Sequence, residues 1–209
     1  MNIGILGAGN VGGALGKRWA QLGHQICFGV RNQTAPDLLE VLAQCGGKAR
    51  AGSARDAAAF GEVVVNALPW PAVEKALAAL DLRGKVLLDC TNPLKADLSG
   101  LEIGTSTSGG EMVAQWAAGA KVVKIFNTTG YGNMDNPVYQ GRGAVMFYCG
   151  DDALSKATAA ALAREIGLDP VDAGPLANAR LLEPYAMLWV WLAMHGGLGR
   201  DFAFQIVKR

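Results

Sequence analysis

Three glycines near the start of the chain have the spacing of a phosphate-binding loop, in the run Gly7-Ala8-Gly9-Asn10-Val11-Gly12. The run follows apolar residues 2–6 and precedes residues 11–22, whose apolar side chains recur at helical spacing. In such a strand–loop–helix unit, Gly7 allows the tight turn, Gly9 lets a pyrophosphate approach the backbone, and Gly12 lets the helix pack closely. The N-terminal N–H groups of the helix and its dipole then favour the phosphate charge. We therefore expect all six residues to bind a dinucleotide; the alternative is glycines that serve turn geometry only.

The end of the second predicted strand, residues 25–30, indicates which dinucleotide is bound. An NAD-preferring domain usually places Asp or Glu there to bind the ribose 2′-OH, but this chain has Arg31 and Asn32 and no carboxylate before Asp37. A guanidinium is suited to bidentate recognition of a 2′-phosphate, and Asn32 can add a hydrogen bond. The sequence therefore predicts NADP(H); the alternative is an ordinary exposed arginine after a strand.

Two further motifs follow predicted strands, where open α/β sheets bind ligands. They are Leu68-Pro69-Trp70, which begins at the last residue of the strand predicted at 62–68, and Asn92-Pro93, after residues 85–90. A proline biases the preceding residue to an extended backbone, which would aim the Asn92 amide toward the site; the alternative is a simple turn. Trp70 either walls the cofactor pocket or packs in the core.

The elements that must position these motifs alternate between strands and helices. Strands are predicted at residues 2–6, 25–30, 62–68, 85–90, 121–126, 144–149 and 168–172. Helices are predicted at residues 11–22, 37–43, 54–59, 71–80, 111–118, from Asp151 or Asp152 to 166, and 177–194. Residues 91–109 and 127–143 are expected to be loops. The alternation predicts an α/β fold, a Rossmann-type doubly wound, mostly parallel sheet. It forms one domain over residues 1–209, with a helical C-terminal element at 177–209.

Composition excludes several classes of protein. The 209 residues carry a formal net charge of +1 without a basic cluster, so we expect no nucleic-acid partner and no anionic membrane. The most apolar segment, residues 185–194, has about half the length that spans a bilayer, and the N-terminus lacks the pattern of a signal peptide. Four cysteines without a C-x-x-C pair favour a reducing cytoplasm. Two distant histidines, His24 and His195, argue against a metal site, and both are expected to be structural.

The C-terminal element has almost no polar face between residues 185 and 194. A helix that is apolar all round has to be buried on all sides, which a terminal helix of a small domain does with difficulty. We therefore expect a homodimer interface at this element; the alternative is a helix that fills its own domain.

Six motifs together resemble the NADPH-dependent deazaflavin reductases, the NADP oxidoreductases that use coenzyme F-420. They are Ile3 to Gly12, Gly29-Val30-Arg31-Asn32, Leu68-Pro69-Trp70, Asp89-x-x-Asn92-Pro93, Cys149-Gly150-Asp151-Asp152 and Asp172-Ala173-Gly174-Pro175-Leu176. The resemblance covers nearly the whole chain. Asp89 to Pro93 and Lys124-x-Phe126-Asn127 are also similar to the reductase domain of animal six-transmembrane ferric reductases.

The resemblance implies hydride transfer between NADP(H) and a flavin-like ring. It places the nicotinamide near Leu68-Pro69-Trp70 and Asn92-Pro93, and the acceptor ring near Phe126, Asn127 and Thr128. Coenzyme F-420, FMN or FAD would be the second substrate. One departure is Asn127, where the deazaflavin reductases commonly carry His, so another planar or carbonyl acceptor stays open.

Hydride transfer between two bound rings requires mostly positioning, and no catalytic acid or base is assigned. A second hypothesis is an NADP-dependent reductase of a small carbonyl or imine, with Lys95 or Tyr131 as proton donor. A third is a sensor that binds NADP(H) without turnover.

Overall fold

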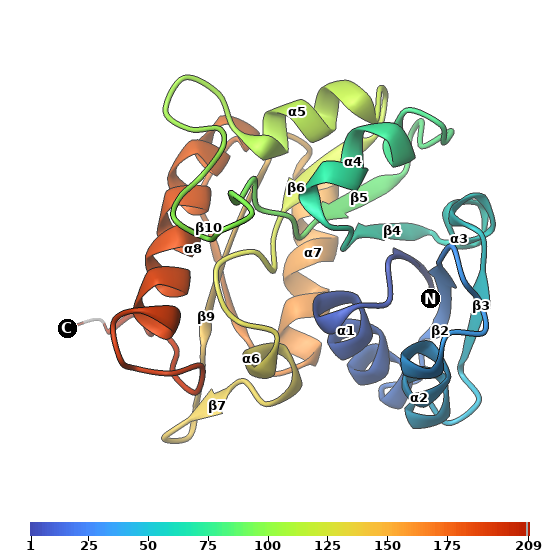
Figure 1. Cartoon of the computed structure of the whole chain (residues 1–209), viewed down its shortest axis with the longest axis horizontal. Coiled ribbons are helices and arrows are strands. Elements are labelled where there is room, and N and C mark those ends of the chain that lie inside the picture. The colour runs from blue at the N-terminus through green and yellow to red at the C-terminus, as the bar shows by residue number, and fades with distance from the viewer. Residues whose placement is uncertain (208) are drawn as a thin grey trace.

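The central sheet has eight strands in the order β10-β9-β6-β5-β4-β1-β2-β3, and a separate hairpin pairs β7 with β8. The computed structural model describes residues 1–207 and 209 (Figure 1). The strands are β1 (Asn2–Leu6), β2 (Gln25–Gly29), β3 (Ala49–Gly52), β4 (Val63–Asn66), β5 (Val86–Asp89), β6 (Lys121–Lys124), β7 (Val138–Tyr139), β8 (Arg142–Gly143), β9 (Val145–Gly150) and β10 (Asp169–Asp172). The helices are α1 (Asn10–Gln21), α2 (Pro36–Gln44), α3 (Ala54–Phe60), α4 (Trp70–Leu77), α5 (Gly109–Trp116), α6 (Gly132–Asp135), α7 (Ala153–Glu165), the 3₁₀ turn η1 (Leu176–Asn178) and α8 (Ala179–Met194).

The segment β3-β2-β1-β4-β5-β6 is parallel throughout and has the strand order of a doubly wound dinucleotide-binding fold. The order reverses at β1, which lies between β2 and β4. β9 runs antiparallel to β6, and β10 runs parallel to β9. The predicted mostly parallel sheet of Rossmann type with a C-terminal helix is confirmed.

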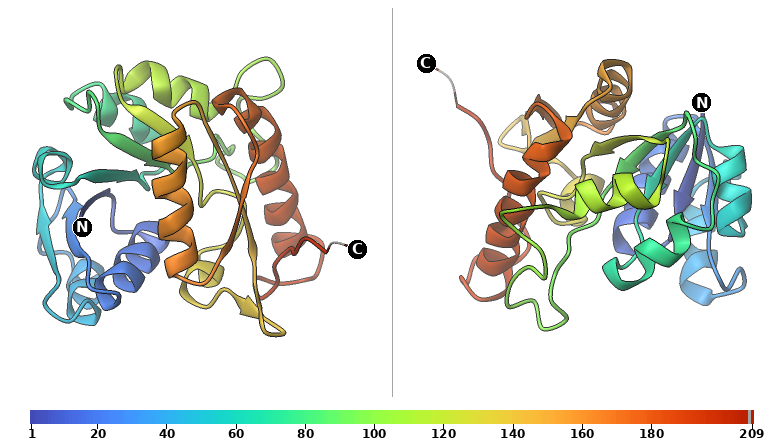
Figure 2. Two further views of the ribbon diagram at one scale, coloured as in Figure 1. Left: turned by 180° about the vertical axis from the view of Figure 1, so that it is seen from behind. Right: turned by 90° about the horizontal axis from the view of Figure 1, so that it is seen from above.

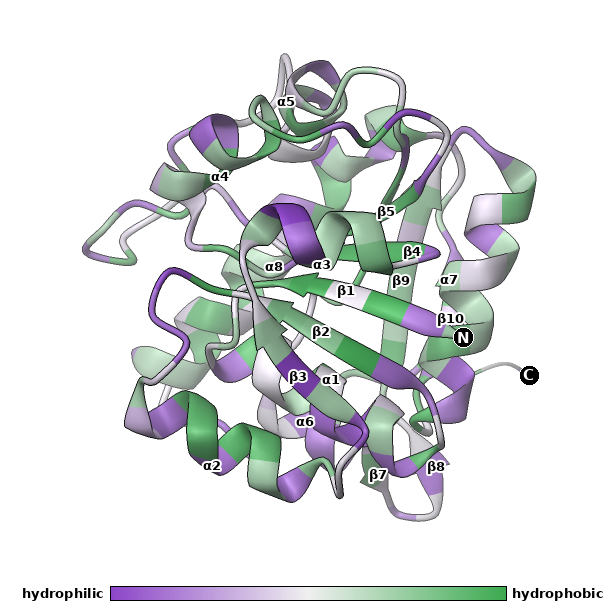
Figure 3. Cartoon of the chain, turned by 90° about the vertical axis from the view of Figure 1, so that its right-hand side faces the viewer, coloured by the Kyte–Doolittle hydropathy of each residue, from purple (hydrophilic) through white to green (hydrophobic). Residues whose placement is uncertain are grey.

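Helices cover both faces of the sheet, as the views in Figure 2 show. One apolar cluster joins the sheet to α1 and α7, and a second joins its other face to α3, α4, α5 and α8. Because both faces are covered, the inner strands are apolar beyond their first residues: in Figure 3, β1 and β2 start in purple and continue mainly in green. The core includes Trp19 of α1, whose ring lies edge-on to Phe126 at 5.6 Å.

Two regions differ from the sequence prediction. β3 was not predicted, because its sequence Ala49-Arg50-Ala51-Gly52 has no apolar run and only one of its residues is fully buried. Residues 127–143, expected to be a loop, contain α6 and the hairpin of β7 and β8. All four of these elements are four residues or shorter, so no periodicity could develop in them.

The C-terminal helix forms as predicted, but it is not buried on all sides within one chain. Its inner face carries Leu182, Ala186 and Trp189. Its outer face exposes four large apolar side chains: Leu181, Leu188, Trp191 and Met194. α8 runs along the side of the molecule opposite β3 (Figure 1). Within the described residues, none of the helices has the length and apolar character needed to span a bilayer.

Candidate active site

The glycine loop joins β1 to α1, and its three glycines meet different constraints. Gly7 has a left-handed backbone, with φ of +96°, and its N–H donates to the Gly29 carbonyl of β2 at 3.0 Å. A Cβ added to Gly12 would lie 2.1 Å from the Gly7 carbonyl oxygen. A Cβ on Gly9 would meet no atom within 4 Å. Gly7 and Gly12 are thus required by the turn and its packing, whereas Gly9 faces open space.

In the part of the chain that the structure describes, the N-terminus of α1 lacks a side-chain cap, as do those of α2, α4, α6 and α8, in contrast to three other helices that pack on the sheet. Helices α3, α5 and α7 have side-chain caps from Ser53, Ser108 and Asp152. α1 begins after Gly9, and in the described structure it has neither a side-chain cap nor an acidic residue in its first turn. Its first N–H groups therefore point from an uncapped helix end beside the exposed Gly9, a cradle that fits a phosphate group.

Arg31 and Asn32 lie next to this cradle, because β2 pairs with β1 in a register that aligns Gly29 with Leu6. Both side chains are exposed. The Asn32 Oδ1 accepts hydrogen bonds from the backbone and the hydroxyl of Thr34, at 3.0 and 2.9 Å, which shapes the turn after β2. Among the residues that the structure describes, the Arg31 guanidinium forms no ion pair, so it can receive an anion.

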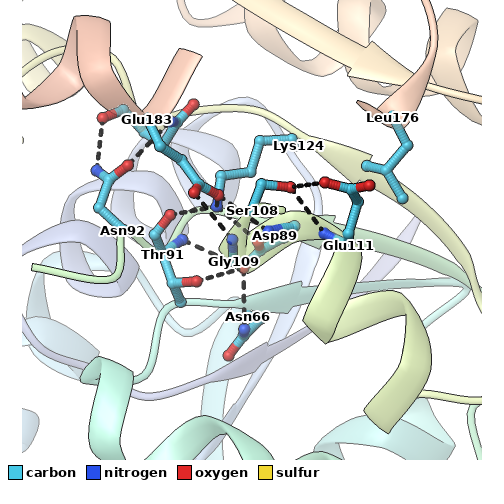
Figure 4. A network of polar contacts seen from close by, with 12 residues as sticks. Asn66, Asp89, Thr91, Asn92, Ser108, Gly109, Glu111, Lys124, Leu176 and Glu183 are labelled. Atoms are coloured by element: carbon cyan, nitrogen blue, oxygen red, sulfur yellow. Dashed lines mark hydrogen bonds and ion pairs between the residues drawn. The ribbon is translucent and has the colours of Figure 1, made fainter. Parts of the chain in front are cut away.

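A buried polar network lies at the carboxyl ends of β4, β5 and β6 (Figure 4). The strand register aligns Asn66 with Asp89 and Asp89 with Lys124. Asp89 accepts hydrogen bonds from the Asn66 amide at 3.0 Å, from the Thr91 hydroxyl at 2.8 Å and from the Lys124 ammonium at 2.9 Å. The Lys124 ammonium also donates to the Thr91 carbonyl. The network therefore fixes the start of the loop that carries Asn92 and Pro93.

Lys124 connects this edge of the sheet to the C-terminal helix. Its ammonium lies 2.8 Å from the Glu183 carboxylate of α8, and both side chains are almost completely buried. Glu183 in turn accepts the N–H groups of Gly109 and Gly110 at the start of α5, both at 2.9 Å. Burial alone would lower the pKa of Lys124, but the charges of Asp89 and Glu183 outweigh it and raise that pKa above its usual value. Lys124 is therefore a charged structural residue.

Sequence reasoning missed this network. In the sequence, Asp89 and Lys124 stand out only as parts of the family motifs, and Glu183 does not stand out within an apolar helix. The signal was present, since a lysine that ends an apolar strand and a glutamate within an apolar helix are both unusual unless they are paired.

Asn92 and Asn127 join the loops that follow β5 and β6. The Asn92 amide donates to the Asn127 backbone carbonyl at 2.9 Å, and the Asn127 amide donates to the Asn92 Oδ1 at 3.0 Å. Asn127 follows Phe126, a buried residue with a left-handed backbone at φ of +61°. The structure thus brings two of the predicted site segments into direct contact.

The remaining predicted residues lie in three kinds of environment. Trp70 begins α4 and is half-buried, with its ring 5.4 Å from that of Trp116 of α5. It therefore packs between two helices at the rim of the site. Leu68 is half-buried, Pro69 is exposed, and Pro93 and Thr128 are buried.

Several other side chains with reactive groups lie in exposed or structural positions. Lys95 and Tyr131 are exposed on loops. His195 is the C-terminal cap residue of α8, and His24 lies 2.8 Å from Glu165, so both have structural positions. Burial raises the pKa of the Cys149 thiol to about 12 and that of Cys90 well above its usual value, so neither forms the thiolate that a nucleophile requires.

Comparison with known proteins supports the same fold and chemistry. The sequence profile of the family described as "NADP oxidoreductase coenzyme F420-dependent" matches residues 2–93. A solved structure from Arthrobacter sp. FB24, described as a candidate F420 dependent NADP-reductase, is 33% identical with a TM-score of 0.87 and is matched over 100% of both chains. A hypothetical protein from Sinorhizobium meliloti is 26% identical with a TM-score of 0.76, over 88% of this chain and 89% of that one.

A curated relative lies further away. Metalloreductase STEAP3 from Rattus norvegicus is 29% identical over 197 residues, which are 90% of this chain. The chain spans 37% of the length of that relative. The full-length match to the Arthrobacter protein carries the assignment, and the profile match over residues 2–93 agrees with it. This chain therefore belongs to the coenzyme F420-dependent NADP oxidoreductases and is an NADP-dependent oxidoreductase.

Proposed function

We propose that this protein transfers a hydride between NADP(H) and a flavin or deazaflavin ring of the F-420 type. The observation that carries the proposal is the uncapped start of α1 beside the open Gly9, at the strand where the sheet order reverses. That point is where doubly wound sheets bind dinucleotides. Family membership and the printed description of the Arthrobacter relative support a deazaflavin acceptor.

In this proposal the backbone from Gly7 to Gly12 holds the pyrophosphate, and Arg31 with Asn32 holds the 2′-phosphate. Leu68, Pro69, Trp70, Asn92 and Pro93 flank the nicotinamide, and Phe126, Asn127 and Thr128 flank the acceptor ring. Bound NADP(H) supplies the hydride. The protein aligns the two rings and excludes water between them, and the acceptor ring can take its proton from solvent, so no side chain has to act as an acid.

The acceptor is tested by anaerobic oxidation of NADPH with coenzyme F-420, FMN, FAD and a panel of small ketones and imines. We expect turnover with F-420 or one of the flavins. Turnover with a carbonyl or imine alone would favour the second hypothesis, and binding of NADPH without turnover on any acceptor would favour a sensor. Because the four cysteines are free and buried, we also propose a reducing, cytoplasmic location.

Arg31→Ala is expected to weaken NADP⁺ binding by about 10- to 100-fold, the effect of losing one or two charge-assisted hydrogen bonds. Affinity for NAD⁺, which lacks the 2′-phosphate, should not change. Isothermal titration calorimetry with both dinucleotides measures this. Arg164→Ala, which removes an exposed arginine of α7, is the matched control and should change neither affinity. Equal affinity of the unmodified protein for NADP⁺ and NAD⁺ would contradict the role of Arg31.

We further propose that the exposed face of α8 forms a homodimer interface. Leu181, Leu188, Trp191 and Met194 form an uncharged stripe along one side of the helix. A second copy can cover the same stripe about a two-fold axis, which makes the contact self-complementary. A partner with a charged face would leave its charges unpaired against this stripe.

Light scattering on a sizing column tests the dimer. We expect the mass of two chains at micromolar concentration and the mass of one chain for Trp191→Glu, because a buried unpaired charge disrupts an apolar contact. Trp191 is 51% exposed within the chain, so the substitution should leave the fold intact. Leu154→Glu is the control, since Leu154 is 77% exposed on α7, away from the stripe. A monomer before any substitution would contradict the proposal.

A further inference from the structure

A buried carbonyl oxygen without a partner lies at the carboxyl edge of the sheet. Among the residues described, only three buried side-chain nitrogen or oxygen atoms lack a hydrogen bond to another protein group, and two are amide oxygens at this edge, Asn66 Oδ1 and Asn127 Oδ1. An unsatisfied buried acceptor costs about 1–3 kcal/mol, and most buried polar groups are paired. Asn127 Oδ1 therefore has no donor from the described residues of the protein, and a ligand bound at this edge of the sheet can supply one.

The orientation of the Asn127 amide is fixed by Asn92. The Asn127 nitrogen donates to Asn92 Oδ1, while the Asn92 nitrogen donates to the Asn127 backbone carbonyl. A flipped Asn127 amide would place two acceptors against each other, so its oxygen must be the end that points away from Asn92. Asn92 is half-buried, so this pair lies at the boundary of the interior.

The backbone that presents Asn127 is strained. Phe126 has φ of +61°, a left-handed conformation that is unfavourable for a bulky L-residue. Its side chain is fully buried, and its N–H contacts the Met146 sulfur at 3.2 Å. Such strain persists only where the surroundings enforce it, and it concentrates at ligand sites. Two neighbouring residues thus carry independent energetic costs at one point of the sheet edge.

The strand order places this point on the nicotinamide side. In a doubly wound sheet the residues after β2 contact the adenosine ribose, and the dinucleotide crosses the reversal of strand order toward the other half. Asn92 follows β5 and Asn127 follows β6, both in that other half. The hydrogen-bond donor of the nicotinamide is the NH₂ group of its carboxamide.

We infer that Asn127 lies where the two proposed rings meet, so that it flanks the acceptor ring while its Oδ1 accepts a hydrogen bond from the carboxamide NH₂ of NADP(H). This residue thereby selects a carboxamide over a carboxylate on the pyridine ring. The inference rests on the proposed function, because it requires NADP(H) at this edge. Because the oxygen is buried, the carboxamide reaches it only if neighbouring protein atoms move when NADP(H) binds. One hydrogen bond at this position also fixes the rotation of the ring, and hence which face of the nicotinamide meets the acceptor.

Binding of three ligands tests the inference: NADP⁺, its analogue with nicotinic acid in place of nicotinamide, and 2′,5′-ADP, which lacks the ring. We expect the unmodified protein to prefer NADP⁺ over the acid analogue by about 10- to 100-fold, because a carboxylate offers no donor to Asn127 Oδ1. Asn127→Ala should reduce that preference to near unity, whereas Asn127→Asp, which keeps an acceptor and adds a negative charge, should retain or increase it. Both variants should bind 2′,5′-ADP with unchanged affinity, which also shows that they are folded.

Arg31→Ala is the matched control, since it should weaken all three ligands and leave the ratio of amide to acid affinity unchanged. If NADP⁺ and 2′,5′-ADP both bind but the unmodified protein does not distinguish the acid analogue, the assignment of Asn127 is wrong while the proposed function stands. The same holds if Asn127→Ala keeps the full preference. If neither NADP⁺ nor 2′,5′-ADP binds, the proposed function fails and this assignment fails with it.

Discussion

Lys124→Met is expected to lower the free energy of unfolding by about 3–5 kcal/mol, the usual effect of removing one partner from a buried ion pair. Lys124 is completely buried between the carboxylates of Asp89 and Glu183, at 2.9 and 2.8 Å. Methionine fills a similar volume, so the loss comes from two uncompensated negative charges rather than from a cavity. Urea denaturation followed by circular dichroism measures the difference.

A second substitution separates charge from packing. Adding Glu183→Gln to Lys124→Met removes one unpaired charge while keeping an oxygen that can accept from Gly109 or Gly110. The double variant should recover part of the lost stability. A double variant less stable than Lys124→Met would show that packing and not charge dominates at this position.

The parts of the fold that the sequence predicted are those with long, regular patterns. The apolar runs of β1, β4 and β5 and the helical spacing of α1 are set by local chemistry that any covered parallel sheet imposes. β3 and α6 could not be predicted in this way, because they are short and their position depends on neighbours distant in the sequence. The exposed stripe of α8 was also unpredictable, since a sequence shows that a helix is apolar but not which side its own domain covers.

The residues of the candidate site fall into the same two groups, those set by local sequence and those set by distant contacts. The glycine loop and Arg31 could be predicted because their spacing reflects a local geometry of strand, turn and helix. The contact between Asn92 and Asn127 joins residues 35 positions apart, and Glu183 reaches Gly109 across 74 positions. Only the strand order and the docking of α8 bring these groups together. The sequence could indicate such residues individually, but it could not predict the hydrogen bonds between them.

Gly9→Ala is expected to weaken NADP⁺ binding by about 10- to 100-fold while leaving the unliganded protein nearly as stable as before. A Cβ at Gly9 meets no protein atom within 4 Å, and the backbone at φ of −73° suits alanine. Alanine is a weaker N-cap than glycine, which lowers stability, but it also restricts the unfolded chain, which raises stability. Each of these two opposing effects is about 1 kcal/mol or less. The methyl group therefore meets nothing until a pyrophosphate approaches. Thermal unfolding and calorimetric titration on the same sample measure the two quantities.

Two other glycines give the contrast that makes this result specific. Gly12→Ala forces a Cβ to within 2.1 Å of the Gly7 carbonyl, so it should lower stability, by about 1–3 kcal/mol, as well as affinity. Gly23→Ala, beyond the far end of α1 at φ of +95°, should cost about 1–2 kcal/mol of stability and leave affinity unchanged. Of these three glycines, only Gly9 should lose affinity on substitution without losing stability. A ligand bound on the loop accounts for that difference. If Gly9→Ala binds NADP⁺ as tightly as the unmodified protein, the pyrophosphate does not lie over Gly9, and the open space there has another use.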